Sequence, residues 1–206
     1  MLKKARIAVL VSGGGTNLQA LLDAQASGIL SSGEIVAVIS SRGDAYALTR
    51  AVKAGVPGFV ASRKDCATQE EFEERISAVL RAQRVDLVIL AGFLSILSEE
   101  FTSRWPRRIL NVHPALIPSF CGKGAYGLHV HEEALRRGVK VTGATVHFVN
   151  GIPDGGEILM QKAVDVLPDD TPETLQRRVM EQAEWILLPR AAEQISAALI
   201  KEKEND

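Results

Sequence analysis

Apolar runs alternate with amphipathic segments through the first half of the chain. Runs that are apolar at nearly every position predict strands covered on both faces, as in a parallel sheet. Between these runs, apolar residues recur at helical spacing. The resulting order of strands and helices predicts a doubly wound, mostly parallel α/β sheet with right-handed crossovers. The predicted strands are residues 7–11, 35–39, 58–61, 86–90 and 108–113.

Local signals predict where the intervening helices begin. Leu18 and Leu21 lie on the apolar stripe of a helix that follows the first strand. Asp44 is predicted to cap the second helix through its carboxylate. Thr68 with Glu71 three residues later resembles a capping box, which predicts the start of the third helix.

The second half of the chain predicts an antiparallel hairpin. Residues 139–149 and 157–166 are rich in β-forming side chains. The segment between them, residues 150–156, contains asparagine, proline, aspartate and several glycines, which favour turns.

A long C-terminal helix is predicted after the hairpin. Thr171 followed by Pro172 is a typical helix start, with a capping hydroxyl and a first-turn proline. Pro189 is expected to interrupt the helix, which then resumes to Ile200. The polar residues 201–206 are expected to be a frayed tail.

Length and composition fit one globular domain. The 206 residues are 46% hydrophobic and 24% charged, and we expect a single domain over residues 1–206. The net charge of −1 gives no overall electrostatic attraction to nucleic acid or to an anionic membrane, and we expect neither as a partner. The first apolar run is too short for a signal peptide or a membrane span, and Cys66 and Cys121 form no metal-type pair. We expect a cytoplasmic protein with reduced thiols, either a monomer or a homodimer.

A glycine-rich turn joins the first strand to the first helix. Residues 12–17 read Ser-Gly-Gly-Gly-Thr-Asn, and backbone N–H groups at such a helix N-terminus bind anions. Three consecutive glycines exceed what a tight turn requires, so we predict a phosphomonoester site. A dinucleotide site is less favoured, because Leu18 stands where its fingerprint needs a third glycine. An NADP-dependent oxidoreductase that uses Gly13, Gly15 and Arg42 stays as an alternative.

Asn111 and His113 stand at the end of the fifth predicted strand, which Pro114 terminates. Side chains alternate along a strand, so these two project to the same side, at the edge where α/β sheets bind ligands. An amide beside an imidazole there would polarise a carbonyl and move a proton. An isolated Asn-x-His is more often bonded only to nearby backbone, so the interpretation depends on the rest of the chain.

Two loops extend beyond the predicted strands. Residues 91–97 are largely apolar and either line a slot for a flat ring or fill the core. Residues 117–127 form a long loop of the kind that is often functional. His129 and His131 follow it, but no partner lies at metal-ligand spacing, so we predict no metal site.

Five motifs follow one another along the chain. They are residues 12–18 (SGGGTNL), 90–93 (LAGF), 111–114 (NVHP), 142–149 (TGATVHFV) and 154–156 (DGG). In this order and at these separations they resemble the phosphoribosylglycinamide formyltransferase family over nearly the whole chain. The resemblance implies a formyltransferase-type, Rossmann-like fold. It also implies transfer of a formyl group from 10-formyltetrahydrofolate to the amine of glycinamide ribonucleotide in purine biosynthesis.

The resemblance assigns roles to individual residues of this chain. The catalytic set is Asn111, His113 and Asp154. The ribonucleotide phosphate and ribose are assigned to Gly14, Gly15, Thr16, Asn17 and Glu184. The folate is assigned to Phe93, Leu94, Ser95, Ile96, Leu97, Asn111 and Val149. The N-terminal half is expected to form the phosphate side and the C-terminal half the folate side, with 10-formyltetrahydrofolate as co-substrate and no metal.

The expected chemistry is direct attack of the substrate amine on the formyl carbon. Asn111 and a protonated His113 would stabilise the negative charge that develops on the formyl oxygen. His113 suits proton transfer because its ordinary pKa is closest to neutrality. Asp154, if its loop folds over the site, would raise the pKa of His113 and hold the imidazolium.

The chain departs from the family pattern at a few positions. Ser95 stands where many relatives have arginine, and Trp185 follows Glu184 where histidine is common. Residues 121–127 form a longer loop than the short Pro-Gly form of some members. None of these departures touches the predicted catalytic set.

Two further classes of function compete with this interpretation. A formyltetrahydrofolate hydrolase or an aminoacyl-tRNA formyltransferase usually carries an additional domain, which is not expected here, and the glycine loop favours a small phosphorylated acceptor. A non-catalytic ligand-binding module would have to bring three polar residues of catalytic type together by chance.

Overall fold

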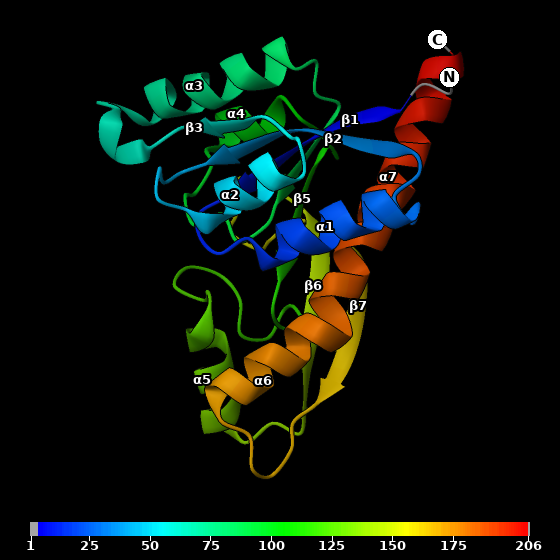
Figure 1. Ribbon diagram of the computed structural model, residues 1–206. Helices are drawn as coiled ribbons and strands as arrows, with labels where there is room; N and C mark the ends of the chain where they lie inside the picture. Colours follow the sequence, from blue (N-terminus) through cyan, green and yellow to red (C-terminus); the bar gives the residue numbers. More distant parts are fainter. Residues whose placement is uncertain (1–3, 206) are drawn as a thin grey trace.

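Seven strands form one sheet in the computed structural model, which describes residues 4–205. Their order is β3-β2-β1-β4-β5-β6-β7 (Figure 1). The first five strands are parallel, β6 is antiparallel to β5, and β7 is antiparallel to β6. The predicted mostly parallel sheet with an antiparallel hairpin is confirmed. The strands are β1 (Ala5–Val11), β2 (Gly33–Ser40), β3 (Gly58–Val60), β4 (Leu87–Leu90), β5 (Ile109–His113), β6 (Val141–Phe148) and β7 (Ile158–Asp165).

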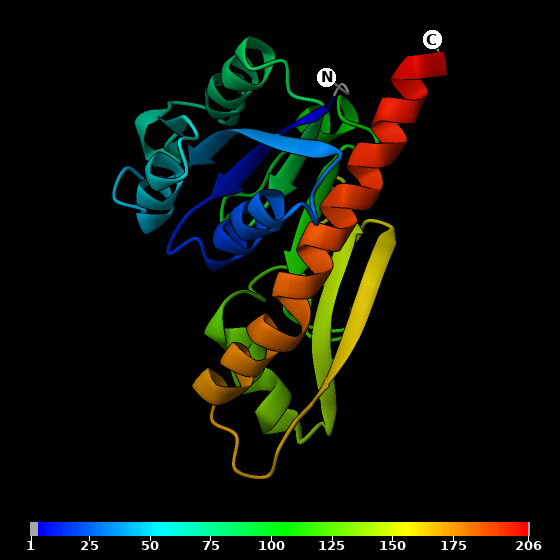
Figure 2. The same ribbon diagram turned by 45° about the vertical axis from the view of Figure 1, so that its right-hand side comes forward.

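Helices cover both faces of the sheet (Figures 1 and 2). One face carries α1 (Thr16–Ser27), α2 (Tyr46–Lys53) and the long α7 (Trp185–Asn205), and the other carries α3 (Gln69–Ala82) and α4 (Glu99–Ser103). Near the far end of the β6–β7 hairpin, α5 (Leu128–Arg137) and α6 (Pro172–Val179) pack against each other. Within residues 4–205, no helix combines the length and the apolar character needed to cross a membrane.

Alternate side chains of β1, an inner strand of the sheet, face different helices. In β1, Ile7, Val9 and Val11 pack with α1 and α7, whereas Ala8 and Leu10 pack with α3 and α4. All five are buried, so a strand in this position needs apolar residues throughout, as the sequence has. The connection that leaves β1 and the connection that enters β4 place their helices on opposite faces of the sheet. This leaves a crevice at the carboxyl ends of the two strands.

Two predicted helix caps are confirmed and one is wrong. Oγ1 of Thr68 accepts a hydrogen bond of 3.2 Å from a first-turn backbone N–H of α3, and Thr171 caps α6 in the same way. However, α2 begins after Ala45, and no side chain caps it. The carboxylate of Asp44 binds the guanidinium of Arg42 through two hydrogen bonds instead, because a planar guanidinium matches both carboxylate oxygens.

The predicted interruption at Pro189 is wrong, because α7 continues through this residue. A proline lacks the N–H that would bond to the carbonyl four residues earlier. Here that carbonyl belongs to Trp185, the first residue after a π-helical turn over Met180–Glu184. The missing bond therefore falls where the helical pitch already changes, and the helix stays continuous.

The predicted frayed tail is also wrong for the residues that the structure describes. Residues 201–205 are helical, whereas Asp206 lies outside the described range. Nζ of Lys203 lies 2.6 Å from Oδ1 of Asp86, the residue before β4. This ion pair ties the last turns of α7 to the start of a central strand.

The loop between β6 and β7 passes very close to its own strand. A Cβ placed on Gly156 would lie 1.7 Å from the carbonyl oxygen of Phe148. The adjacent N–H of Phe148 donates to the carbonyl of Glu157 at 2.9 Å, so the two strands are already paired there. Backbone atoms held in a sheet cannot move aside as a side chain would. Only glycine fits at this position, and it sets the path of the loop.

We therefore expect Gly156→Ala to lower the free energy of unfolding by about 1–3 kcal/mol, the usual range for overpacking. Urea denaturation of the purified variants measures this change. Gly43→Ala is the matched control, because a Cβ there would meet nothing within 4 Å. Equal unfolding midpoints for the two variants would contradict the close approach.

Candidate active site

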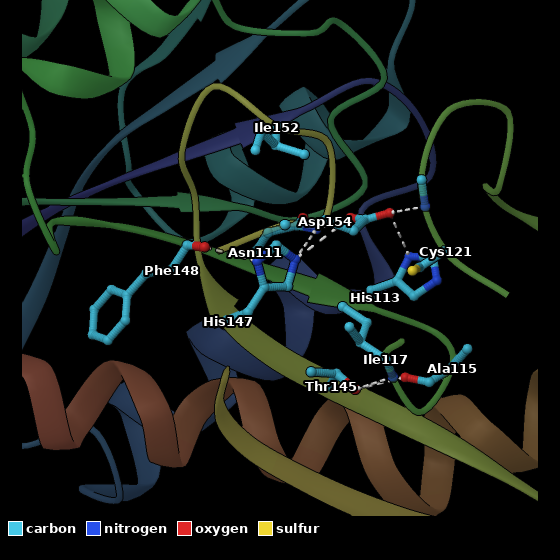
Figure 3. A network of polar contacts seen from close by, with 12 residues as sticks. Asn111, His113, Ala115, Ile117, Cys121, Thr145, His147, Phe148, Ile152 and Asp154 are labelled. Carbon is cyan, nitrogen blue, oxygen red and sulfur yellow. Dashed lines mark hydrogen bonds and ion pairs between the residues drawn. The ribbon is translucent and has the colours of Figure 1, made fainter. Parts of the chain in front are cut away.

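Asn111 and His113 lie at the carboxyl end of β5, with both side chains on the same side of the strand, as predicted (Figure 3). β6 pairs antiparallel with this end of β5, so that His147 stands opposite Asn111 and Thr145 stands opposite His113. The imidazole of His113 is buried, and Asn111 is half-buried. The sheet thus holds the predicted pair between two neighbouring strands.

Asp154 reaches the same place from the β6–β7 loop (Figure 3). Its φ of 54° is in the left-handed region, which aspartate tolerates better than most residues. Oδ2 lies 3.5 Å from Nδ1 of His113 and accepts a hydrogen bond of 2.9 Å from the N–H of Gly122. Oδ1 lies 3.5 Å from both Nδ2 of Asn111 and Nε2 of His147. The structure therefore brings the three predicted catalytic residues together, with Asn111 and His113 beside the carboxylate of Asp154.

Hydrogen bonding determines which nitrogen of His113 carries the proton. Nε2 lies 2.8 Å from the carbonyl oxygen of Phe120. A carbonyl only accepts hydrogen bonds, so Nε2 must be the protonated nitrogen. In the neutral ring, Nδ1 is then an unprotonated base that faces Asp154.

Asp154 raises the pKa of His113, as predicted, but the net shift of this pKa is downward. Burial lowers this pKa and outweighs Asp154 and the Phe120 carbonyl, both of which raise it. The buried ring loses more solvation as a cation than a single carboxylate restores. For Asp154, burial raises the pKa, but the contacts with His147 and with the N–H of Gly122 leave it below its ordinary value. A neutral imidazole and an ionised carboxylate therefore face each other at neutral pH.

His147 is a member of this cluster that the sequence analysis did not assign. Its Nδ1 lies 2.8 Å from the carbonyl oxygen of Phe148, so Nδ1 carries the hydrogen. Nε2 then accepts a hydrogen bond of 3.1 Å from Nδ2 of Asn111, which orients the amide. Antiparallel pairing of residues 139–149 with the strand that ends in Asn111 would have predicted this contact.

The segment that follows β5 is anchored to β6 by Thr145. Its hydroxyl donates to the carbonyl of Ala115 at 2.7 Å and accepts from the N–H of Ile117 at 3.1 Å. The long loop predicted after this strand thereby starts from a fixed point. It brings the carbonyl of Phe120 and the N–H of Gly122 to the cluster.

The predicted phosphate loop is an open turn at the start of α1. Gly15 has a left-handed φ of 73°, and a Cβ there would lie 2.7 Å from Cβ of Ala47. At Gly14 nothing lies within 4 Å of such an atom, so the turn is uncovered. Nε of Arg50 donates to the carbonyl of Gly14 at 2.9 Å. An exposed turn at a helix N-terminus, next to a guanidinium, suits a phosphate group.

Asn17 and Glu184, distant in sequence, meet below this turn. Nδ2 of Asn17 donates to Oε2 of Glu184 at 2.6 Å, and both residues are buried. Oδ1 of Asn17 has no hydrogen-bond partner among the described residues. Burial raises the pKa of Glu184 to about 7, although the Asn17 hydrogen bond lowers it. The structure thus joins the predicted phosphate-binding and ribose-binding residues.

Most residues predicted to bind folate line a cavity of about 110 Å³ beside Asp154. Leu94 is the exception in this set, because it is exposed and lines an adjoining cavity of about 410 Å³. His113 and Asp154 line that second cavity as well. The smaller cavity is lined by Phe93, Ser95, Ile96, Leu97, Asn111 and Val149, together with residues of the β6–β7 loop.

The two histidines of α5 have different surroundings. His131 is fully buried, burial lowers its pKa to about 4, and neither ring nitrogen has a partner among the described residues. His129 is exposed and lies 2.8 Å from Glu132. Both cysteines, Cys66 and Cys121, are free. In the part of the chain that the structure describes, no three His, Cys, Asp or Glu side chains are placed to hold a metal ion.

Comparison with known proteins agrees with this fold. Residues 5–191 match the formyl transferase family. The phosphoribosylglycinamide formyltransferase of Haemophilus influenzae is 39% identical over 200 residues, which cover 97% of this chain and 91% of that protein. The chain therefore belongs to the formyl transferase family, and the resemblance found in the sequence is confirmed.

Solved structures show the same similarity in three dimensions. Glycinamide ribonucleotide transformylase 1 from Symbiobacterium toebii has a TM-score of 0.88 at 41% identity, over 95% of this chain and 89% of that one. Phosphoribosylglycinamide formyltransferase from Brucella melitensis has a TM-score of 0.86 at 42% identity, over 95% and 97% of the two chains.

The chain also matches one part of much longer proteins. It is 43% identical to the trifunctional purine biosynthetic protein adenosine-3 of both Drosophila melanogaster and Homo sapiens, over 92% and 98% of this chain. It spans only 14% and 19% of the length of those two proteins.

The buried carboxyl of Glu184 predicts an unusual dependence of stability on pH. Its pKa is about 7 in the folded protein, compared with an ordinary value of 4.5, so folding opposes its ionisation. The stability that the neutral carboxyl contributes to the folded protein is fully present below pH 4.5 and is lost as the pH rises through 7. Between pH 5 and pH 8 this loss amounts to about 2–3 kcal/mol.

Glu184→Gln should remove this loss, because glutamine keeps an acceptor for Asn17 and cannot ionise. Urea denaturation at pH 5 and pH 8 tests it, with the exposed Glu181→Gln as the matched control on the same turn. An equal loss of stability in wild type and Glu184→Gln would show that the carboxyl ionises normally.

Proposed function

We propose that the chain transfers the formyl group of 10-formyltetrahydrofolate to the amine of glycinamide ribonucleotide, a step of purine (IMP) biosynthesis. The observation that carries the proposal is the contact of Asp154 with both Asn111 and His113, next to the cavity lined by residues 93–97. The similar proteins named phosphoribosylglycinamide formyltransferase support the choice of acceptor.

His113 is proposed to receive the proton of the attacking amine. The amine nitrogen forms a bond to the formyl carbon, and the bond from that carbon to the folate nitrogen breaks. Nδ1 of the neutral His113 takes the proton from the amine, and the departing folate nitrogen later receives it. Asp154 stabilises the imidazolium that exists between these two transfers, at 3.5 Å from Nδ1.

Asn111 is proposed to stabilise the formyl oxygen. The shorter contact of its Nδ2, 3.1 Å to His147, fixes the plane of the amide. The longer contact, 3.5 Å to Asp154, is the one that a formyl oxygen would replace. A donor held in place before the reaction stabilises the developing negative charge at little reorganisation cost.

The acceptor is proposed to bind along the glycine turn. Backbone N–H groups of Gly14 and Gly15, with Thr16 and Asn17, would hold the phosphate, and the carboxyl of Glu184 would accept from the ribose hydroxyls. The unpartnered Oδ1 of Asn17 offers a further acceptor at this place. One domain over residues 1–206 would then hold the ribonucleotide at the end of β1 and the folate at the ends of β4 and β5.

The proposal is tested by following release of tetrahydrofolate in the presence and absence of glycinamide ribonucleotide. We expect release to require the ribonucleotide, and Asn111→Ala and Asp154→Asn each to lower kcat by about 10²–10³-fold. His129→Gln is the control, because its side chain is exposed and contacts only Glu132 in the described hydrogen bonds.

Other outcomes would identify the competing functions. Release of tetrahydrofolate without the ribonucleotide would indicate a formyltetrahydrofolate hydrolase. Binding of both substrates without any turnover would indicate a ligand-binding module. Circular dichroism of each variant separates loss of activity from loss of fold.

A further inference from the structure

A cavity that the proposed reaction does not use lies between α1 and the first turns of α7 (Figure 2). Its volume is about 640 Å³, which is typical of small-molecule sites. Residues three or four positions apart share one side of a helix. One such side of α1 forms a wall of the cavity, with Thr16, Gln19, Ala20, Asp23, Ala24 and Ser27. Residues 185, 186, 189 and 190 of α7 form another wall, and Ile29 and Arg50 complete the lining.

The cavity begins at the glycine turn, where its lining is positively charged. Thr16 is the first residue of α1 and follows the turn directly. Nε of Arg50 donates to the carbonyl of Gly14, and its Nη1 donates to Oε1 of Gln19, each at 2.9 Å. Arg190 is exposed and makes no hydrogen bond or ion pair with any described residue. Two arginines and one aspartate give the lining a net formal charge of +1, which favours an anion.

Beyond the turn, the lining is largely apolar and includes an aromatic ring. Trp185 is half-buried, and its neighbours in the lining are Ile186 and Pro189. It lies close to the turn, because the preceding residue, Glu184, bonds to Asn17 in the first turn of α1. The N–H of the indole is buried without an acceptor among the described residues, although buried tryptophans usually have one. Packing alone therefore does not account for this side chain, whose ring offers a flat surface to a ligand.

Asp23 supplies a hydrogen-bond acceptor further along the same wall. It lies two helical turns after Thr16, about 10 Å along the axis of α1. Oδ1 accepts a hydrogen bond of 2.8 Å from Nε2 of Gln19, whereas Oδ2 accepts none from any described residue. The cavity thus presents an anion site, an aromatic surface and an acceptor in one continuous space. The corresponding ligand has a phosphate, a flat ring and an amino group at comparable separations.

We propose that this cavity binds a purine nucleoside monophosphate. The phosphate lies at the glycine turn, the base stacks on Trp185, and an amino group of the base donates to Asp23. The proposed acceptor places its own phosphate at the same turn, so the nucleotide and the acceptor exclude each other. Formyl transfer then slows as the concentration of finished purine nucleotides rises. The competition rests on the proposed function, whereas binding of the nucleotide does not.

Calorimetric titration of the purified protein tests the binding site without any reaction. The probes are adenosine 5′-monophosphate (AMP) and ribose 5-phosphate, which has the phosphate and the sugar but no base. We expect Kd for AMP to be about 5- to 100-fold lower, the effect of stacking one base on an aromatic side chain. In Trp185→Ala, Kd for AMP should rise to that for ribose 5-phosphate, and Kd for ribose 5-phosphate should stay unchanged.

Steady-state turnover tests the competition. AMP should raise the apparent KM for glycinamide ribonucleotide and leave kcat unchanged, because both molecules need the glycine turn. Ribose 5-phosphate should have the same effect only at concentrations about 5- to 100-fold higher.

A second variant separates the loss of the cavity from a change at the start of α7. Ala20 is half-buried and lines the cavity from α1, so Ala20→Leu fills part of the space for the base. We expect this variant to lose the preference for AMP and to keep its KM for glycinamide ribonucleotide. Ala82→Leu is the matched control, because Ala82 is exposed on α3, which covers the opposite face of the sheet. It should bind AMP as the wild type does.

Equal Kd values for AMP and ribose 5-phosphate in the wild type would overturn the proposal. So would a preference for AMP that survives in both Trp185→Ala and Ala20→Leu, or AMP binding that leaves the KM for the ribonucleotide unchanged. Formyl transfer that AMP does not inhibit would leave the proposed function standing and reject the nucleotide site. AMP binding that depends on Trp185, without any formyl transfer, would keep the nucleotide site and reject the proposed reaction.

Discussion

The carboxylate of Asp154 is largely buried and needs hydrogen-bond donors from the protein. The elements at the C-terminal ends of the parallel strands are arranged around this requirement. Only 13% of its side chain is exposed, so its oxygens need donors from the protein. The N–H of Gly122 and the amide of Asn111 supply them, and the imidazoles of His113 and His147 lie 3.5 Å from the carboxylate. The loop after β5, the ends of β5 and β6, and the β6–β7 loop therefore close around a single group.

Burial sets the charges of titratable groups both around Asp154 and below the glycine turn. It lowers the pKa of His113 and raises that of Glu184, which favours the neutral form in both residues. Asp154 stays ionised because donated hydrogen bonds outweigh its own burial. A neutral base beside a fixed negative charge is suited to accept a proton near pH 7. The proposed reaction uses this arrangement in its first proton transfer.

The strands and most helices could be predicted because they depend on local pattern. The alternation of side chains along a strand also predicted that Asn111 and His113 lie on the same side of β5. The position of Asp154 came from resemblance alone, since it depends on the close approach at Gly156 and a left-handed backbone. His147 was missed because strand pairing is a tertiary property. The effect of Asp154 on the pKa of His113 was predicted, but the net lowering was not, because burial is not visible in a sequence.

The most direct test of this account is an NMR titration of the His113 imidazole in wild type and Asp154→Asn, with the signal assigned by its loss in His113→Gln. The account predicts a pKa below 6.5 in the wild type, because burial lowers it. It also predicts a still lower pKa in Asp154→Asn, because the carboxylate that raises it is gone. A pKa of His113 above 6.5, or one that does not change in Asp154→Asn, would contradict the central role of this carboxylate.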